Sequence, residues 1–239
     1  MLIDLISLIH KYKLNITGIL HVGASVCEEL PCYKKCGLSN NDIYWIEGNE
    51  DNITTIKNTL ENDIKIYNYL IDEYDNREVN FNISNALMSS SILDFGTHLD
   101  HHRGIIMIKK VRKTTKRLDT MINENNIIMQ TVNFLNVDIQ GTELRAIKSL
   151  GTYLQYIDYI MTEINTESVY IDCTIINELD EYLNKSGFIR VETKIYSNCG
   201  WGDAFYIRKN ILNENEYYNS QEFLNYKTKQ RGEDIYFEY

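Results

Sequence analysis

Three strand-like segments of the sequence end on glycine together with an acid or a small polar residue. The most informative is residues 133–143, where an apolar run leads into Asp138, a glycine turn and a second carboxylate, Glu143. Similar endings occur at residues 19–24 and 44–48. Ligands of open α/β sheets collect at the carboxyl ends of the strands. We therefore expect one small-molecule site at the three ends, of a kind that suits a nucleoside cofactor.

The first of these turns, after residue 22, combines Gly23, Ala24 and Ser25. Small residues allow a backbone to approach a ligand closely, although simple tight packing explains them equally well. Ser25 is expected to cap the following helix, whose free amides favour an anionic group. The turn holds one glycine instead of the GxGxxG pattern, which argues against NAD and FAD.

Glu47 closes the second strand-like segment, after the apolar residues 44–46. It follows the first turn by roughly twenty residues, the separation at which an acid binds ribose hydroxyls in nucleoside-binding folds. A surface glutamate before a helix is the alternative, but the apolar flank favours ribose binding.

These segments belong to a longer alternation of β-rich and helical runs, which predicts an α/β fold with a mostly parallel sheet covered on both faces. The predicted strands are residues 18–22, 43–47, 64–70, 105–111, 134–138, 156–163, 188–192 and 204–208. The predicted helices are residues 25–37, 50–61, 118–125, 142–152 and 174–186. We expect a single domain over 1–239, with an N-terminal helix in 1–14, a core in 15–209 and a polar extension in 210–239. The polar insert 72–100 holds a short edge strand, 79–83, and a serine loop, and long inserts of this kind are often functional.

Charge and cysteine content restrict the class of partner. The formal net charge of −10 argues against nucleic acid, which requires a basic footprint. The basic run 109–117 is the exception, and a solvated strand whose charges protect a sheet edge explains it better than a polyanion site. Five cysteines without a CxxC pair indicate reduced thiols in a cytoplasmic protein. The apolar residues 1–10 are too short to span a bilayer, so no membrane partner is expected.

Taken in order, the motifs resemble those of the FkbM-type S-adenosylmethionine-dependent methyltransferases over about residues 15–209. They are His21-Val22-Gly23-Ala24, Glu28-Glu29-Leu30, Trp45-Ile46-Glu47-Gly48, Ser89-Ser90-Ser91-Ile92-Leu93, Leu118-Asp119-Thr120, Asp138-Ile139-Gln140-Gly141-Thr142-Glu143, Thr162-Glu163-Ile164-Asn165 and Trp201-Gly202-Asp203-Ala204-Phe205-Tyr206.

The resemblance implies a class I methyltransferase (Rossmann-like) fold and S-adenosylmethionine as methyl donor. It implies methyl transfer to a hydroxyl, often on a sugar or a polyketide-like compound. It places the methionine part of the donor at Gly23 and Ala24, its ribose at Glu47, and Asp138 beside the methyl group. His21 stands where the wider class often has an aspartate.

Methylating a hydroxyl requires a base near the methyl group, because an alcohol is a weak nucleophile at neutral pH. The candidates are His98, whose imidazole type titrates in the useful range, and the strand-end acids Asp138 and Glu163. The same two acids could hold a divalent cation, but a metal is not predicted.

The acceptor is expected to meet Trp201 and Asp203, since an indole suits the apolar face of a sugar ring and a carboxylate suits its hydroxyls. The alternative for Trp201 is that it only packs against the sheet. Ser90 and Ser91 either donate hydrogen bonds to the acceptor or only turn the chain. The predicted function is O-methylation of a sugar, glycan or related small molecule. A nucleoside-binding module without catalysis is the first alternative, and a methyltransferase acting on RNA or protein is the second.

Overall fold

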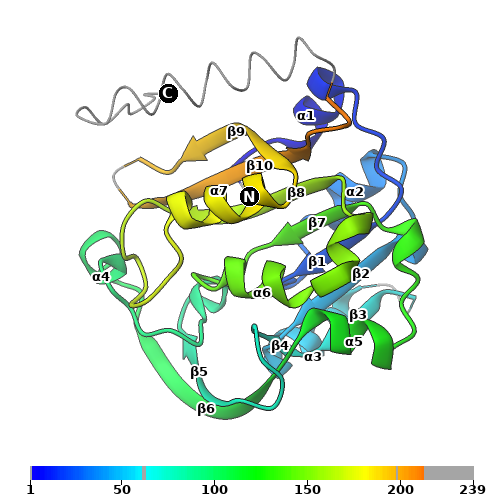
Figure 1. Cartoon of the computed structure of the whole chain (residues 1–239). Helices are drawn as coiled ribbons and strands as arrows, with labels where there is room; N and C mark the ends of the chain where they lie inside the picture. The colour runs from blue at the N-terminus through cyan, green and yellow to red at the C-terminus, as the bar shows by residue number, and fades with distance from the viewer. Residues whose placement is uncertain (1, 61–62, 198, 213–239) are drawn as a thin grey trace, which may run out of the picture.

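A seven-stranded sheet forms the centre of the protein in the computed structural model, which describes residues 2–60, 63–197 and 199–212 (Figure 1). Its order is β3-β2-β1-β7-β8-β10-β9. Only β10 runs against the others. The strands are β1 Ile19–Val22, β2 Ile43–Glu47, β3 Lys65–Asn68, β7 Phe134–Val137, β8 Tyr159–Asn165, β9 Phe188–Ile195 and β10 Trp201–Arg208.

Helices cover both faces of this sheet (Figure 1). One face packs against α5 Leu118–Glu124, α6 Glu143–Ser149 and α7 Ile176–Lys185. The other packs against α1 Leu5–Tyr12, α2 Leu30–Lys35 and α3 Glu50–Thr59. Because both faces are covered, β1, β2, β7 and β8 are buried along their whole length, and their sequences are nearly continuous apolar runs. The prediction of a mostly parallel sheet between two helical layers is confirmed.

The apolar start of the chain forms the expected helix, α1, packed on the domain. Asp4 caps it by accepting hydrogen bonds from the amides of Ile6 and Ser7, and Lys13 ends it in a left-handed conformation. Leu5 and Leu8 are buried. Among the described residues, no helix is long and apolar enough to cross a membrane.

A second, three-stranded sheet lies beside the main one, in the order β4-β6-β5. Its strands are β4 Leu70–Ile71, β5 Glu78–Ser84 and β6 Met107–Lys116. The predicted edge strand 79–83 is therefore β5. The predicted strand 105–111, however, does not join the main sheet: as β6 it pairs with β4 and β5 instead. Periodicity identifies a strand, but not the sheet that it joins.

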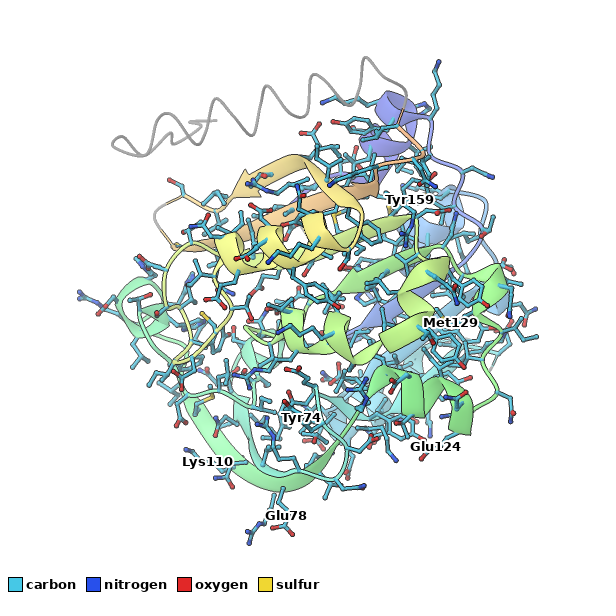
Figure 2. The ribbon with its side chains drawn as sticks, in the orientation of Figure 1. Tyr74, Glu78, Lys110, Glu124, Met129 and Tyr159 are labelled. Carbon is cyan, nitrogen blue, oxygen red and sulfur yellow. The ribbon has the colours of Figure 1, made fainter. Side chains whose placement is uncertain are left out.

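The basic run 109–117 forms most of β6. Among the described residues, β4 pairs only with residues 115–116 of this strand, so residues 109–114 have β5 on one side and an open sheet edge on the other. The expected position at a sheet edge therefore agrees with the structure for most of the run. Its side chains are solvated and paired with acids. Lys110 lies 3.0 Å from Asp94, and Arg112 lies 2.9 Å from Glu78. Figure 2 shows Lys110 and Glu78 on the outer side of the small sheet. Acids of neighbouring elements thus offset most of the positive charge of the strand.

The helix predicted over 25–37 is much shorter in the structure. Ser25 and Cys27 have left-handed φ angles of 47° and 62°, so the chain makes turns and α2 begins at Leu30, followed by Pro31. Ser25 does not cap it. Its hydroxyl instead donates to the Glu28 carboxylate at 3.0 Å.

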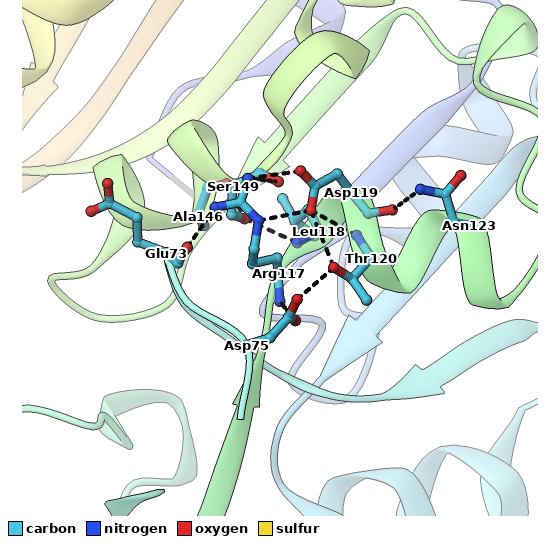
Figure 3. A network of polar contacts seen from close by, with 9 residues as sticks. All are labelled: Glu73, Asp75, Arg117, Leu118, Asp119, Thr120, Asn123, Ala146 and Ser149. Carbon is cyan, nitrogen blue, oxygen red and sulfur yellow. Dashed lines mark hydrogen bonds and ion pairs between the residues drawn. The ribbon is translucent and has the colours of Figure 1, made fainter. Parts of the chain in front are cut away.

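A polar network fastens the start of the 72–100 insert to α5 and α6 (Figure 3). The Arg117 guanidinium donates to both oxygens of Asp119, at 2.9 and 2.7 Å, and to the main-chain oxygen of Glu73 at 2.6 Å. Asp75 accepts from the Arg117 amide and the Thr120 hydroxyl. The insert is therefore anchored where it leaves the main sheet.

The remaining short elements are the helix α4 His98–His101 and the 3₁₀ turns η1 Asn40–Asp42, η2 Leu87–Ser89, η3 Met129–Thr131 and η4 Gly151–Tyr156. Of the predicted extension 210–239, residues 213–239 lie outside the described part of the chain.

Candidate functional site

A cavity of about 420 Å³ opens at the carboxyl ends of β1, β2 and β7, where the three glycine-and-acid turns meet. The Gly23 amide donates to Ile46 and the Asp138 amide donates to Val22, each at 2.9 Å, so the three turns are in direct contact. All predicted site residues except Ala24 line the cavity, namely His21, Gly23, Ser25, Glu47, Ser90, Ser91, His98, Asp138, Glu163, Trp201 and Asp203.

The first turn brings its backbone against the neighbouring strand end. Gly23 has a φ of 91°, and a Cβ atom there would lie 1.7 Å from the main-chain oxygen of Asp138. Only glycine fits at this position. The Ala24 side chain is fully buried and packs in the core against α1 and α2, so it faces away from the cavity. Ala24 is therefore the one predicted site residue whose side chain does not line the cavity.

Glu47 is held by the turns on either side of it. One carboxylate oxygen accepts from the Ser25 amide at 2.7 Å and the other from the Asn49 amide at 2.6 Å. Burial raises the pKa of Glu47 to about 7 against the opposing effect of these bonds. Asn52, on α3, also lines the cavity and is 2% exposed, and its Oδ1 has no hydrogen-bond partner in the described structure. No sequence pattern identified Asn52, because only the fold brings it beside Glu47.

His21 is neutral at physiological pH. Burial lowers its pKa to about 3. Its ring stacks on Trp45 at a centroid distance of 4.7 Å, and its Nδ1 lies 3.0 Å from the Tyr33 hydroxyl. His21 thus contributes an uncharged ring to the lining of the cavity.

Two carboxyl groups converge at the ends of β7 and β8. The side-chain nitrogen of Gln140 donates to Asp138 at 2.7 Å and to Glu163 at 2.6 Å. The Tyr170 hydroxyl donates to Oε1 of the same amide at 2.5 Å, which fixes the orientation of the Gln140 side chain. Burial raises the pKa of Asp138. The pKa of Glu163 rises well above its usual range through burial and then through the charges of Asp138 and its acidic neighbours.

Gln140 and Tyr170 are functional candidates that the sequence reasoning missed. Gln140 lies inside the 138–143 motif, but its contact with Glu163 depends on the neighbouring strand. The Ser91 hydroxyl donates to the main-chain oxygen of Gln140 at 2.7 Å, and Ser90 accepts from the Ser84 amide at 3.2 Å. Both serines therefore fix the loop over the cavity.

His98 is buried against aromatic rings. It stacks on Phe95 at 4.1 Å and lies 4.9 Å from His102, centroid to centroid. Burial, then the nearby histidines, lower its pKa to about 4, and its Nδ1 has no hydrogen-bond partner among the described residues. The expectation that this imidazole titrates near neutral pH is therefore not supported by its surroundings.

Trp201 and Asp203 lie on β10, at the far side of the cavity. The Trp201 ring stacks on Tyr196 at 5.0 Å, and its Nε1 donates to His102 at 3.4 Å. Asp203 is 3% exposed, and its carboxylate accepts hydrogen bonds from the main-chain amides of Leu2 and Ile3. The chain's own backbone therefore uses part of the hydrogen-bonding capacity of Asp203.

The cavity is strongly acidic. Its lining includes the carboxyl groups of Glu28, Glu29, Glu47, Asp138, Glu163 and Asp203. No lysine or arginine lines it within the described ranges. Among the described residues, no three or more histidine, cysteine, aspartate or glutamate side chains are grouped so that they could hold a metal ion.

The family model of the methyltransferase FkbM domain matches residues 21–190. Among solved structures, TrmK of M. capricolum in complex with S-adenosyl-homocysteine is 14% identical with a TM-score of 0.43, over 95% of this chain and 87% of that one. Sp1610 of Streptococcus pneumoniae, a putative tRNA (m1A22) methyltransferase, is 12% identical with a TM-score of 0.42, over 95% and 80%. The human methyltransferase 10 domain containing protein is 11% identical with a TM-score of 0.40, over 85% and 81%. A comparison with curated proteins gave no match.

Proposed function

The chain belongs to the FkbM methyltransferase family, and from this premise we propose that it methylates a hydroxyl of a sugar, glycan or related small molecule with S-adenosylmethionine. The observation that carries the proposal is the acidic cavity at the ends of β1, β2 and β7. Its six carboxyl groups, without a lysine or arginine in the described lining, complement a ligand that carries positive charge.

The residues at one end of the cavity fit the parts of this methyl donor. The Gly23 turn allows close backbone approach for the methionine part. Glu47 lines the cavity as the carboxylate for the ribose hydroxyls, and the unpartnered Oδ1 of Asn52 lies in the same wall of the cavity. When bound, S-adenosylmethionine supplies a methyl group already activated by a sulfonium.

The Asp138–Glu163 pair is the best-placed base for the acceptor hydroxyl. Raised pKa values bring carboxyl groups closer to neutral pH, where a general base is most effective. His98, with a pKa lowered to about 4, is a weaker proton acceptor at the same pH. We therefore assign His98 to the wall of the acceptor site and proton removal to the carboxyl pair.

The acceptor end of the cavity combines aromatic rings with polar edges. Trp201, Tyr170 and His98 line it, and Asp203 lies beside them. Rings of this kind suit the apolar face of a sugar, and carboxyl groups suit its hydroxyls. The acidic lining disfavours acceptors rich in phosphate, which supports a neutral acceptor over RNA.

The test is transfer of an isotopically labelled methyl group from S-adenosylmethionine to panels of free sugars, glycans, RNA and protein. Label on a sugar or glycan, as a base-stable ether, is the expected result. Asp138→Asn should abolish the transfer while the protein stays folded. Label on RNA or protein alone would replace the proposed acceptor class, and mass spectrometry of glycans made with and without the gene identifies the product.

A further inference from the structure

The carboxyl groups of Asp138 and Glu163 share a single amide nitrogen, which holds them close together at the cavity wall. Nε2 of Gln140 is within hydrogen-bond distance of both. Gln140 itself has a left-handed φ of 58°, and the Ser91 and Tyr170 hydroxyls fix its main chain and side chain. The arrangement is therefore built by four separate segments of the chain, and Gln140 is its positioning residue.

Three more carboxyl groups and one uncharged phenol surround the pair. The groups that face it are Glu29 before α2, Glu143 at the start of α6, Asp203 on β10 and the Tyr170 phenol. No lysine or arginine of the described lining faces it. Two enclosed carboxylates so close together do not both ionise readily, and they titrate as one coupled unit.

We propose that the Asp138–Glu163 pair, clamped by Gln140, shares one proton in the free protein and releases it when the cationic methyl donor binds. The inference rests on the proposed function, because it takes S-adenosylmethionine as the ligand of this cavity. A sulfonium cation replaces the proton as the positive charge beside the two carboxyl groups.

In the reaction, the pair then takes up the proton that the acceptor hydroxyl loses. During transfer, the bond between sulfur and the methyl carbon breaks, a bond from this carbon to the acceptor oxygen forms, and the hydroxyl proton passes to the pair. The sulfur of S-adenosylhomocysteine is uncharged, and the pair again holds one proton. Donor binding should therefore release a proton, whereas binding of the demethylated product should not.

Isothermal titration calorimetry in buffers of different ionisation enthalpy counts these protons without any acceptor. With the full chain near neutral pH, we expect about one proton released for each S-adenosylmethionine bound and close to none for S-adenosylhomocysteine. The difference between the two ligands should disappear at alkaline pH, where the pair is already ionised.

Substitutions test whether the released proton comes from the Asp138–Glu163 pair. Glu163→Gln keeps the shape of the side chain and leaves one carboxyl group, so both ligands should then bind without proton release. Asp138→Asn is the second test, should the first variant fail to fold. Gln140→Met removes the donor to both carboxyl groups and should move proton release to higher pH. Glu181→Gln, the same chemical change on the exposed surface of α7, is the control and should behave as the wild type.

Two outcomes distinguish the inference from the function on which it rests. Equal proton counts for the two ligands in the wild-type protein would overturn the shared proton and leave the methyl-donor site intact. If neither ligand binds, the proposed function itself fails.

Discussion

The main-chain oxygen of Asp138 lies against Gly23 so closely that a Cβ atom on Gly23 would come within 1.7 Å of it. This contact joins the ends of β1 and β7, and the Gly23 amide joins the end of β2 through its bond to Ile46. The three strand ends therefore meet around one cavity.

The close contact predicts a severe effect of Gly23→Ala. The new methyl group would collide with backbone at a φ of 91°, which side chains rarely adopt. We expect the free energy of unfolding to fall by about 2–4 kcal/mol and binding of S-adenosylhomocysteine to be lost. Chemical denaturation and calorimetry measure the two effects.

Gly37→Ala is the matched control. Gly37 has a similar φ of 89°, but nothing lies within 4 Å of its added Cβ. The control should cost about 1 kcal/mol and leave ligand binding unchanged. Equal effects of the two substitutions would contradict the importance of the contact with Asp138.

Glu47→Gln tests the ribose site. Each oxygen of Glu47 accepts one amide hydrogen, from Ser25 and from Asn49, and a glutamine can satisfy only one of them. We expect the affinity for S-adenosylhomocysteine to fall by roughly 10-fold or more, measured by calorimetry. Glu50→Gln, at an exposed position of α3, should not change it. An unchanged affinity in Glu47→Gln would remove this residue from the site.

The buried Glu143 predicts a pH dependence of stability. Burial raises its pKa from the usual 4.5 to about 7, so the folded protein binds more protons than the unfolded chain between these values. The contribution of Glu143 to stability is therefore present below pH 4.5 and is lost as the pH rises through about 7.

Glu143→Gln isolates this effect, because the same Oε1 atom accepts from both Ile139 and Gly141 and a glutamine oxygen can replace it. The stability of the variant relative to wild type should rise by about 1–3 kcal/mol across that window. Denaturant unfolding at several pH values measures it. Glu178→Gln, at an exposed position of α7, should show the same pH dependence of stability as the wild type. A stability difference between Glu143→Gln and the wild type that does not change with pH would show that this carboxyl group does not cause the pH dependence.

The network in Figure 3 predicts that Arg117 stabilises the anchored insert. Arg117→Ala removes a bidentate pair with Asp119 and the bond to the Glu73 carbonyl. We expect the free energy of unfolding to fall by about 2 kcal/mol. Arg112→Ala, which removes an exposed ion pair with Glu78, should stay within about 0.5 kcal/mol. Thermal or denaturant unfolding measures the two stabilities. A comparable loss of stability in Arg117→Ala and Arg112→Ala would contradict the role of the network.

The architecture was readable from the sequence because parallel strands between helical layers are continuous apolar runs. Their ends carried glycine and acid, and this placed Gly23, Glu47 and Asp138 at one site. The class I methyltransferase fold is confirmed by the sheet order and the family match. The small sheet could not be predicted, because strand pairing between 70–71 and 107–116 depends on contacts distant in sequence.

The chemistry of the site was only partly readable. Gln140 follows Asp138 by two residues in the chain, but it also contacts Glu163 on another strand. This second contact depends on the tertiary structure, so the sequence does not reveal it. The pKa of His98 is set by burial against Phe95 and by neighbouring histidines, which residue type alone does not reveal. The start of α2 was misplaced because Ser25 adopts a left-handed conformation that its residue type does not favour.

The central claim is that the turns after β1, β2 and β7 form one site for S-adenosylmethionine. Calorimetric titration of the full chain with this ligand and with S-adenosylhomocysteine tests it most directly. We predict saturable binding of one molecule per chain, with competition between the two and loss in Gly23→Ala but not in Gly37→Ala. Absence of binding by the folded wild-type protein at millimolar ligand would contradict the account.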